Sequence, residues 1–127
     1  MSFSDPFQVL RNQLVTMVNR PATVWDNVEL PANPPYLIVE IVPLVHDTVA
    51  HNYAEMKNGI FQVTVVTKSG IGSPESEAIA QRVADCFPAG WKQDGVIVTH
   101  PASLVQGYPN NGLWRLPVQI RWRVLPG

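Results

Sequence analysis

The last third of the chain ends in a run that alternates between apolar and polar side chains. It reads LWRLPVQIRWRV, from Leu113 to Val124. The apolar side chains fall on one parity: Trp114, Leu116, Val118, Ile120, Trp122 and Val124. The other parity holds Arg115, Pro117, Gln119, Arg121 and Arg123. Because successive side chains of a strand point to opposite faces, the run predicts a long strand with one apolar face and one cationic face.

Two other segments have the three- and four-residue spacing of an amphipathic helix. The first begins with an Asp-Pro pair, a typical helix start, and its apolar residues predict a helix over about residues 6–19. The second begins with Ser-Pro at residues 73–74, where the serine can cap the helix. Its apolar residues continue to Phe87, and Pro88-Ala89-Gly90 stops it.

Further runs rich in β-branched residues predict strands, and they are Tyr36–Leu44, Ile60–Lys68, Gly95–His100 and Ala102–Gln106. Asn111-Gly112 is a hairpin signal before the last strand. This order predicts an α+β fold, with a mixed or mainly antiparallel sheet of about five strands and two helices packed on one face. The arginines of the last strand then lie on the opposite face, which we expect to be bare.

Tryptophan and phenylalanine side chains are the expected structural anchors. The connector Pro21–Pro35 holds four prolines, but its apolar residues predict an ordered loop that Trp25 pins to the sheet. The full set of candidate anchors is Trp25, Phe87, Trp114 and Trp122.

The composition favours one domain that has partners. The chain has 127 residues, of which 46% are hydrophobic and 15% charged, and its net charge is −1. We therefore expect a single domain over residues 1–127. Soluble domains are typically about 25% charged, so the low value suggests that partners cover part of the surface. No strong net charge attracts nucleic acid or membranes.

No leader or membrane-spanning segment is expected. The N-terminus lacks the pattern of a secretory signal, and no apolar run approaches the roughly 20 residues that a membrane span needs. We expect a soluble protein of intracellular origin without a membrane partner. Its single cysteine, Cys86, cannot form an internal disulfide, and we expect it to be a small buried hydrophobic residue in the second helix.

The search for catalytic and ligand sites favours a protein that is not an enzyme. Asp47, His51 and Glu55 have a spacing that could hold a metal if helical, but a solvated loop is the favoured interpretation. The Gly-rich turn at 70–73 lacks the lysine of a phosphate-binding loop. No serine has a nucleophile context, and no paired acids lie near a base. We predict no catalytic residues, no metal and no cofactor.

The cationic face suggests an interface. Arginine is enriched at subunit boundaries, although three arginines on a strand could also be solvated or paired with acids. Nucleic-acid binding by stacking is disfavoured, because Trp114 and Trp122 lie on the other face of the strand. The candidate interface residues are Arg115, Gln119, Arg121 and Arg123, together with His46, Asp47, His51 and Tyr53 of the polar interval 46–58, which could form a protruding arm.

The whole arrangement resembles the tail terminator, or tail completion, proteins of long-tailed bacteriophages. The features that carry the resemblance are an N-terminal helix leading to Val24-Trp25-Asp26-Asn27, the strand Pro35–Val39, the run Gly59–Val65 followed by Gly70-Ile71-Gly72 and the helix Ala78–Phe87, and the C-terminal strand pair. They span nearly the whole chain.

The resemblance implies a structural function. Proteins of this type are small α+β subunits that close into a six-fold ring, which caps the tail tube, stops its polymerisation and joins it to the head-side connector. The expected partners are further copies of the chain, the tail tube protein and a connector or neck protein, with DNA only as cargo in the lumen. The expected location is the virion tail at the neck, after assembly in the host cytoplasm. The alternatives are another head–tail joining or neck protein and a small nucleic-acid-binding module.

Overall fold

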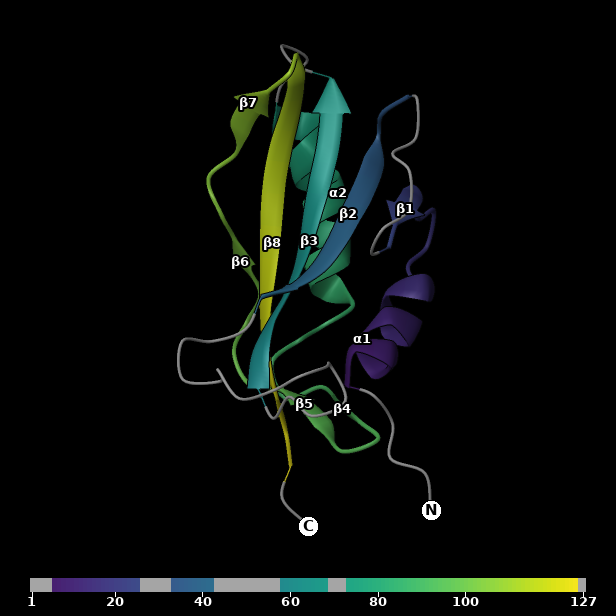
Figure 1. The fold of residues 1–127 in the computed structure, drawn as a ribbon, viewed down its shortest axis with the longest axis vertical. Coiled ribbons are helices and arrows are strands. Elements are labelled where there is room, and N and C mark those ends of the chain that lie inside the picture. Colours follow the sequence, from purple (N-terminus) through teal and green to yellow (C-terminus); the bar gives the residue numbers. More distant parts are fainter. Residues whose placement is uncertain (1–5, 26–32, 43–57, 69–72, 126–127) are drawn as a thin grey trace.

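The structure is a computed structural model that describes residues 6–25, 33–42, 58–68 and 73–125 (Figure 1). Its elements are α1 Pro6–Val15, β1 Ala22–Val24, β2 Tyr36–Val42, β3 Asn58–Lys68, α2 Ser73–Asp85, β4 Lys92–Gln93, β5 Val96–Val98, β6 Ser103–Leu104, β7 Tyr108–Asn110 and β8 Leu113–Val124. The long last strand therefore has the bounds that the alternation predicted.

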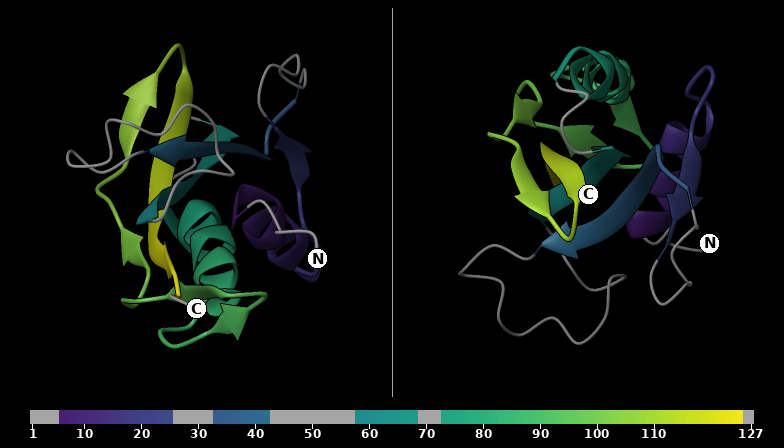
Figure 2. Two further views of the ribbon diagram at one scale, coloured as in Figure 1. Left: turned by 60° about the horizontal axis from the view of Figure 1, so that its bottom comes forward. Right: turned by 90° about the horizontal axis from the view of Figure 1, so that it is seen from above.

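The strands form one mixed sheet. Its order is β1-β2-β3-β8-β5-β4, and β6 and β7 also pair with β8. β1 is parallel to β2, and the other pairs are antiparallel. Along one side of β8 run β5, β6 and β7 as a single interrupted strand. Figure 2 shows that the sheet curls around the helices. The α+β class and the mixed sheet are thus confirmed.

The predicted number of strands was wrong, because the sheet has eight strands and not about five. The three additional strands are β1, β4 and β7, of two or three residues each. Such short segments cannot show an alternating pattern, and each of them is a strand because a neighbour offers backbone groups to pair with. β1 lies in the connector that was predicted to be a loop, and β7 in the predicted turn.

Two tight turns join neighbouring strands in the same way. Asn111 and Gly112 have φ angles of 53° and 77° between β7 and β8, and Asp94 and Gly95 have φ angles of 49° and 83° between β4 and β5. Positive φ at both central residues is the mark of a type I′ hairpin turn. The predicted Asn-Gly hairpin is confirmed, and the Asp-Gly turn repeats its geometry.

Helix α1 ends earlier than the spacing predicted, at Val15 instead of near residue 19. The next two amides tighten into i→i−3 bonds, from Thr16 N to Gln13 O at 3.1 Å and from Met17 N to Leu14 O at 3.0 Å. The Thr16 hydroxyl also donates to Gln13 O, at 2.6 Å. A helix end that satisfies its last carbonyls in this way needs no further turn.

One apolar core joins both helices to the concave face of the sheet. From β8 it takes Leu116, Val118, Ile120 and Trp122, four of the six residues of the predicted apolar parity, and Trp122 has 2% of its surface exposed. Phe61 of β3 lies at its centre, with its ring centroid 5.8 Å from that of Phe7 on α1 and 5.6 Å from that of Phe87 after α2. Because both helices share this core, they pack on the same face of the sheet.

Candidate interaction surfaces

The outer face of the sheet, away from the helices, carries the predicted arginine face. On β3, the cross-strand partners of Arg115, Gln119 and Arg121 are Val66, Gln62 and Ile60. These partners alternate along β3 with the residues that face the main core. The structure therefore brings all four β8 candidates, Arg115, Gln119, Arg121 and Arg123, to one face. Their surroundings differ along the strand, so they do not form one uniform surface.

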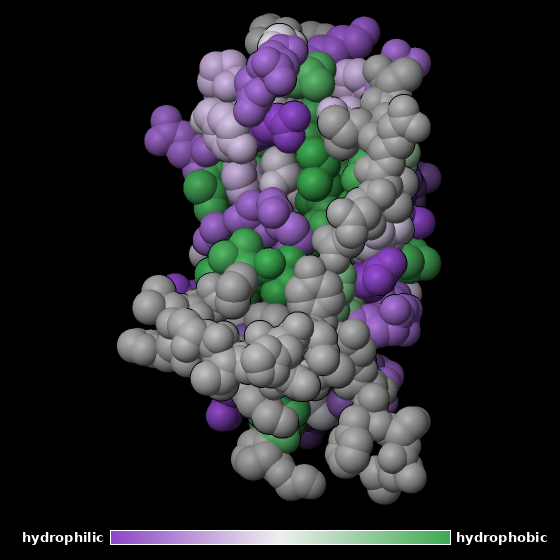
Figure 3. All heavy atoms as spheres, viewed as in Figure 1, coloured by the Kyte–Doolittle hydropathy of each residue, from purple (hydrophilic) through white to green (hydrophobic). Residues whose placement is uncertain are grey.

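The end of the outer face near Arg115 is apolar and partly buried. Val24, Tyr36 and Val66 form a second hydrophobic cluster there, with Ile38 and Leu113 packed against it. Arg115 is half-buried beside this cluster, and its Nε has no hydrogen-bond partner within the described part of the chain. Figure 3 shows a stripe of hydrophobic residues beside hydrophilic ones on this part of the face. The expectation of a bare outer face is therefore wrong at this end.

A ladder of polar side chains crosses the middle of the outer face. Gln119 donates through Nε2 to Oε1 of Gln62 at 2.9 Å, and Gln62 donates through Nε2 to Oε1 of Glu40 at 3.1 Å. The three residues are cross-strand partners on β8, β3 and β2. Such pairs stabilise a sheet and fix its register. Gln119 therefore has a structural partner of its own.

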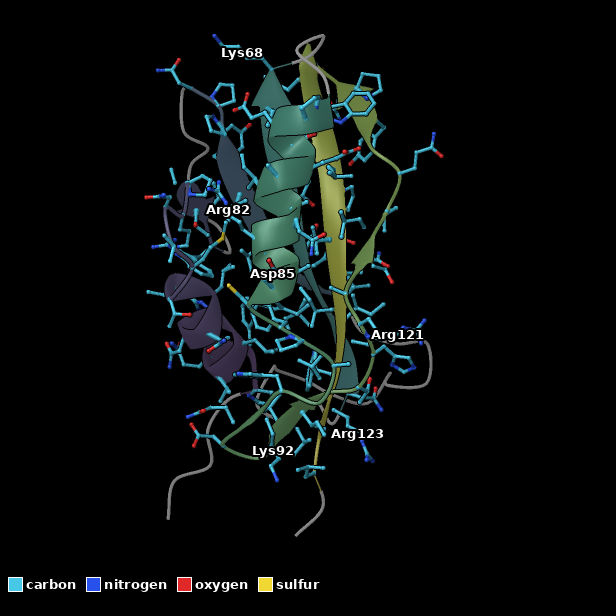
Figure 4. All side chains as sticks on the ribbon, turned by 180° about the vertical axis from the view of Figure 1, so that it is seen from behind. Lys68, Arg82, Asp85, Lys92, Arg121 and Arg123 are labelled. Carbon is cyan, nitrogen blue, oxygen red and sulfur yellow. The ribbon has the colours of Figure 1, made fainter. Side chains whose placement is uncertain are left out.

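The other end of the outer face is basic and exposed. We call Lys92, Arg121 and Arg123 the basic end. Lys92 pairs with Ile97 and Ile97 with Arg123, so that the lysine and the arginine share one cross-strand row. Both arginines are exposed, and neither has an ion-pair partner among the described residues. Figure 4 shows all three at the end of the molecule where β4 and β5 lie.

The candidates of the polar interval lie outside the described residues. They are His46, Asp47, His51 and Tyr53. The same holds for the possible metal ligands in that interval. Among the residues that the structure does describe, no group of three or more histidine, cysteine or acidic side chains could hold a metal ion. None of the described helices is long and apolar enough to cross a membrane.

The anchor candidates occupy different places. Phe87 and Trp122 are buried in the main core. Trp25 is half-buried and packs against the main core, and its ring lies 4.7 Å from the Arg11 guanidinium of α1. Trp114 is half-buried beside Gly107. Because Trp122 is buried, it cannot stack on a nucleic-acid base together with the basic end.

Two exposed hydrophobic patches were missed in the sequence. The edge patch is Leu104, Val105 and Tyr108, with 41%, 37% and 44% of their surfaces exposed. The helix patch is Val15 and Val18 at the end of α1, exposed by 51% and 74%. The two patches include every large hydrophobic residue that is exposed within the described ranges. In the sequence, Leu104 and Val105 fell in a predicted strand, Tyr108 fell in the predicted turn, and Val18 belonged to the apolar stripe of the predicted helix.

A groove of about 320 Å³ opens beside the helix patch, where α1 and α2 end. Its lining residues are Gln13, Thr16, Met17, Val18, Arg82, Asp85 and Cys86. Gln13 donates through Nε2 to Cys86 O at 2.8 Å, which ties the two helix ends together. Burial, and then the Asp85 carboxylate, raise the pKa of the Cys86 thiol. Cys86 is half-buried just after α2, and not within the helix as expected.

Comparison with known proteins gives a family and a fold. The chain matches the family described as phage tail terminator protein over residues 7–122. No curated protein matches it. One solved structure, 25% identical, has a TM-score of 0.65 and covers 94% of this chain and 96% of that chain. A chain of the virion of a native gene transfer agent particle is 16% identical, with a TM-score of 0.48, and the match covers 91% of this chain and 84% of that chain.

Proposed function

This chain belongs to the phage tail terminator family, and from this premise we propose that it ends the growth of a phage tail tube by closing into a ring on the tip of the tube. The chain is a structural protein of the phage tail and not an enzyme. The observation that carries the proposal is the family match, which extends over residues 7–122 and so includes both helices and nearly all of the sheet.

The proposed ring is a hexamer of single-domain subunits, each formed by residues 1–127. Such a ring needs heterologous contacts, in which one surface of a subunit meets a different surface of the next. The edge patch and the helix patch supply two different apolar surfaces, and they support this arrangement. The ring would sit at the neck of the virion, after assembly in the host cytoplasm, and DNA would pass through its lumen.

We assign contact with another virion protein, either the tube protein or the head-side connector, to the basic end. Arg121 and Arg123 are exposed and uncompensated among the described residues, so an acidic surface could pair with them without breaking an existing ion pair. Arg115 and Gln119 are proposed to serve the sheet instead, because one borders the apolar cluster and the other belongs to the polar ladder.

The proposed function is tested by the length of tail tubes. Tube protein of the same phage is polymerised with and without the purified chain, and the lengths are measured by negative-stain electron microscopy. With the chain present we expect elongation to stop and ring-shaped density with six-fold symmetry to lie at one tube end. Tubes that continue to grow at the same rate, with bare ends, would exclude a terminator role.

A further inference from the structure

The two exposed hydrophobic patches lie on opposite sides of the molecule. In Figure 1 the edge patch belongs to β6, β7 and the segment between them, on the left, and the helix patch lies at the end of α1, on the right. The view from above in Figure 2 separates β7 and α1 in the same way. A single copy therefore cannot bring its two patches together. Exposed apolar patches of this kind mark interaction sites.

The edge patch also presents unpaired backbone. β6 pairs with β8 on one side, and within the described part of the chain no strand lies on its other side. Val105 N donates to Pro117 O of β8 at 2.9 Å. Because backbone groups alternate in direction along a strand, the N–H and C=O of Leu104 point away from β8. An open strand edge with exposed apolar side chains is a template on which another chain can pair.

The groove beside the helix patch has the complementary chemistry. Val18 supplies an exposed apolar rim, and Met17 supplies a buried apolar floor. Arg82 and Asp85 of α2 line the same groove, and Figure 4 shows both on α2. A guanidinium can donate to a free backbone carbonyl, and a carboxylate can accept from a free N–H. The groove therefore offers apolar contact and polar partners to an open strand edge.

We propose that the edge patch of one copy docks into the helix groove of a second copy of this chain. The occupant is a second copy because the apolar edge and the groove occur on opposite sides of the same chain. The edge offers free backbone groups, and the groove offers the charged side chains that can bond to them. The contact is heterologous, since each copy uses its edge patch toward one neighbour and its helix groove toward the other. Repetition of such a contact gives either a closed ring or an open filament.

The closure of these contacts into a ring rests on the proposed function. The inference adds which two surfaces of the chain form each contact. It also explains why two unrelated exposed patches exist in a chain that is otherwise well packed. The groove holds the single cysteine of the chain, Cys86, so docking would cover this thiol in every subunit contact.

The test blocks each surface separately. Val18→Asp places a charge on the groove rim, where 74% of the side chain is exposed and the fold should tolerate it. Leu104→Asp does the same at the edge patch, and Val105→Lys is a second edge variant in case the first is unfolded. Each variant should raise the dissociation constant of self-association at least tenfold, measured by sedimentation and native mass spectrometry, with thermal unfolding to check the fold.

Mixing the blocked variants tests the heterologous geometry. A Val18→Asp copy keeps its edge patch, and a Leu104→Asp copy keeps its groove. An equimolar mixture should therefore form a one-to-one dimer that cannot grow, although neither variant associates with itself. In this dimer the Leu104→Asp copy should have its Cys86 protected from a thiol reagent, whereas Cys86 of the Val18→Asp copy stays reactive.

Matched controls place the same charge elsewhere. Gln8→Asp lies on an exposed site near the other end of α1, and Ala89→Asp lies in the exposed turn after α2. Both should assemble as the wild type does. The inference is overturned if the groove and edge variants assemble like these controls, or if the mixture of blocked variants stays monomeric.

The outcomes separate this inference from the proposed function. If both blocked variants still cap tail tubes as well as the wild type, the docking assignment is overturned and the terminator role stands. If the mixture gives the dimer but the wild type leaves tube growth unchanged, the docking assignment stands and the terminator role fails. A wild type that is monomeric both alone and on tubes overturns both.

Discussion

Gly107 lies against the face of the Trp114 indole, and the contact shows how one residue without a side chain positions a large one. A Cβ built at Gly107 would come within 2.6 Å of the Trp114 Nε1 and 2.7 Å of its Cε2. The φ of Gly107 does not lie in the left-handed region, so space and not backbone conformation requires glycine here. The half-buried Trp114 thereby packs against the segment that joins β6 to β7.

Gly107→Ala should lower the free energy of unfolding by about 1–3 kcal/mol, the usual cost of overpacking. The physical reason is that the rigid indole must shift to admit the methyl group. Chemical denaturation measures the loss. In a Trp114→Ala background the same glycine substitution should cost almost nothing, since the obstacle is gone. Equal costs in both backgrounds would show that the contact is unimportant.

The Cys86 thiol predicts a pH dependence. Burial, and then the negative charge of Asp85, raise its pKa above the ordinary value of 9.0. The folded state thus holds the proton more tightly than the unfolded chain. The resulting stabilisation is fully present below pH 9.0 and is lost as the pH rises through the folded-state pKa.

The free energy of unfolding of the wild type should therefore fall more steeply above pH 9.0 than that of Cys86→Ser, which has no thiol to ionise. Denaturation at a series of pH values measures the difference, and the other titrating groups cancel in the comparison. Parallel pH profiles of the two proteins would contradict the prediction.

Strand β3 shows how one element serves both faces of the sheet. Phe61, Val63 and Val65 point into the core and are fully buried, while Gln62 between them belongs to the polar ladder of the outer face. The ring of Phe61 contacts the aromatic rings of Phe7 and Phe87. Because these rings come from the two helical regions, β3 helps to join both helices to the sheet.

Phe61→Ala should cost about 3–5 kcal/mol of unfolding free energy, since it leaves a cavity where two ring–ring contacts were. Ile60→Ala is the matched control, because its side chain is only half-buried on the outer face of the same strand. The control should lose clearly less stability in the same denaturation experiment. A similar loss for both would mean that the core is not centred on Phe61.

At the scale of the whole molecule, the described surface divides into parts of different chemical character. The helices cover the concave face, the apolar cluster and the polar ladder occupy much of the outer face, and the basic end remains exposed. The edge patch and the helix groove lie at the two sides. A subunit with separate side and end surfaces suits the proposed ring, in which the side surfaces would join the copies and the end surface would contact another virion protein.

Reversal of the charge at the basic end should separate the proposed contact with another virion protein from the proposed contact between copies. In the double variant Arg121→Glu and Arg123→Glu we expect an unchanged oligomer by native mass spectrometry, but binding to isolated tails or heads that is at least tenfold weaker, because the acidic partner is repelled. Lys68→Glu, an exposed charge at the far end of β3, is the control. Loss of the oligomer would place the arginines in the subunit contact, and unchanged binding would exclude an interface role.

The local sequence predicted those elements whose own residues show an alternation, a helical spacing or a turn signal. The bounds of β8 and its apolar face follow from the alternation of its residues, and the hairpin before it follows from Asn111-Gly112. Both depend on steric rules that act within a few residues. For the same reason the two helices could be placed, although the exact end of α1 depended on the Thr16 hydroxyl.

The short strands and the character of each surface were decided only by the tertiary structure. β1, β4 and β7 are strands because distant segments offer them hydrogen bonds. The arginine face is divided because strands far apart in the sequence place Tyr36 and Val66 beside Arg115, Gln62 beside Gln119 and Lys92 in the row of Arg123. Leu104 is exposed because the sheet ends beside it, and Val18 is exposed because helix α1 ends before it. Sequence alone determined which way side chains alternate, whereas burial and neighbours depend on what folds against them.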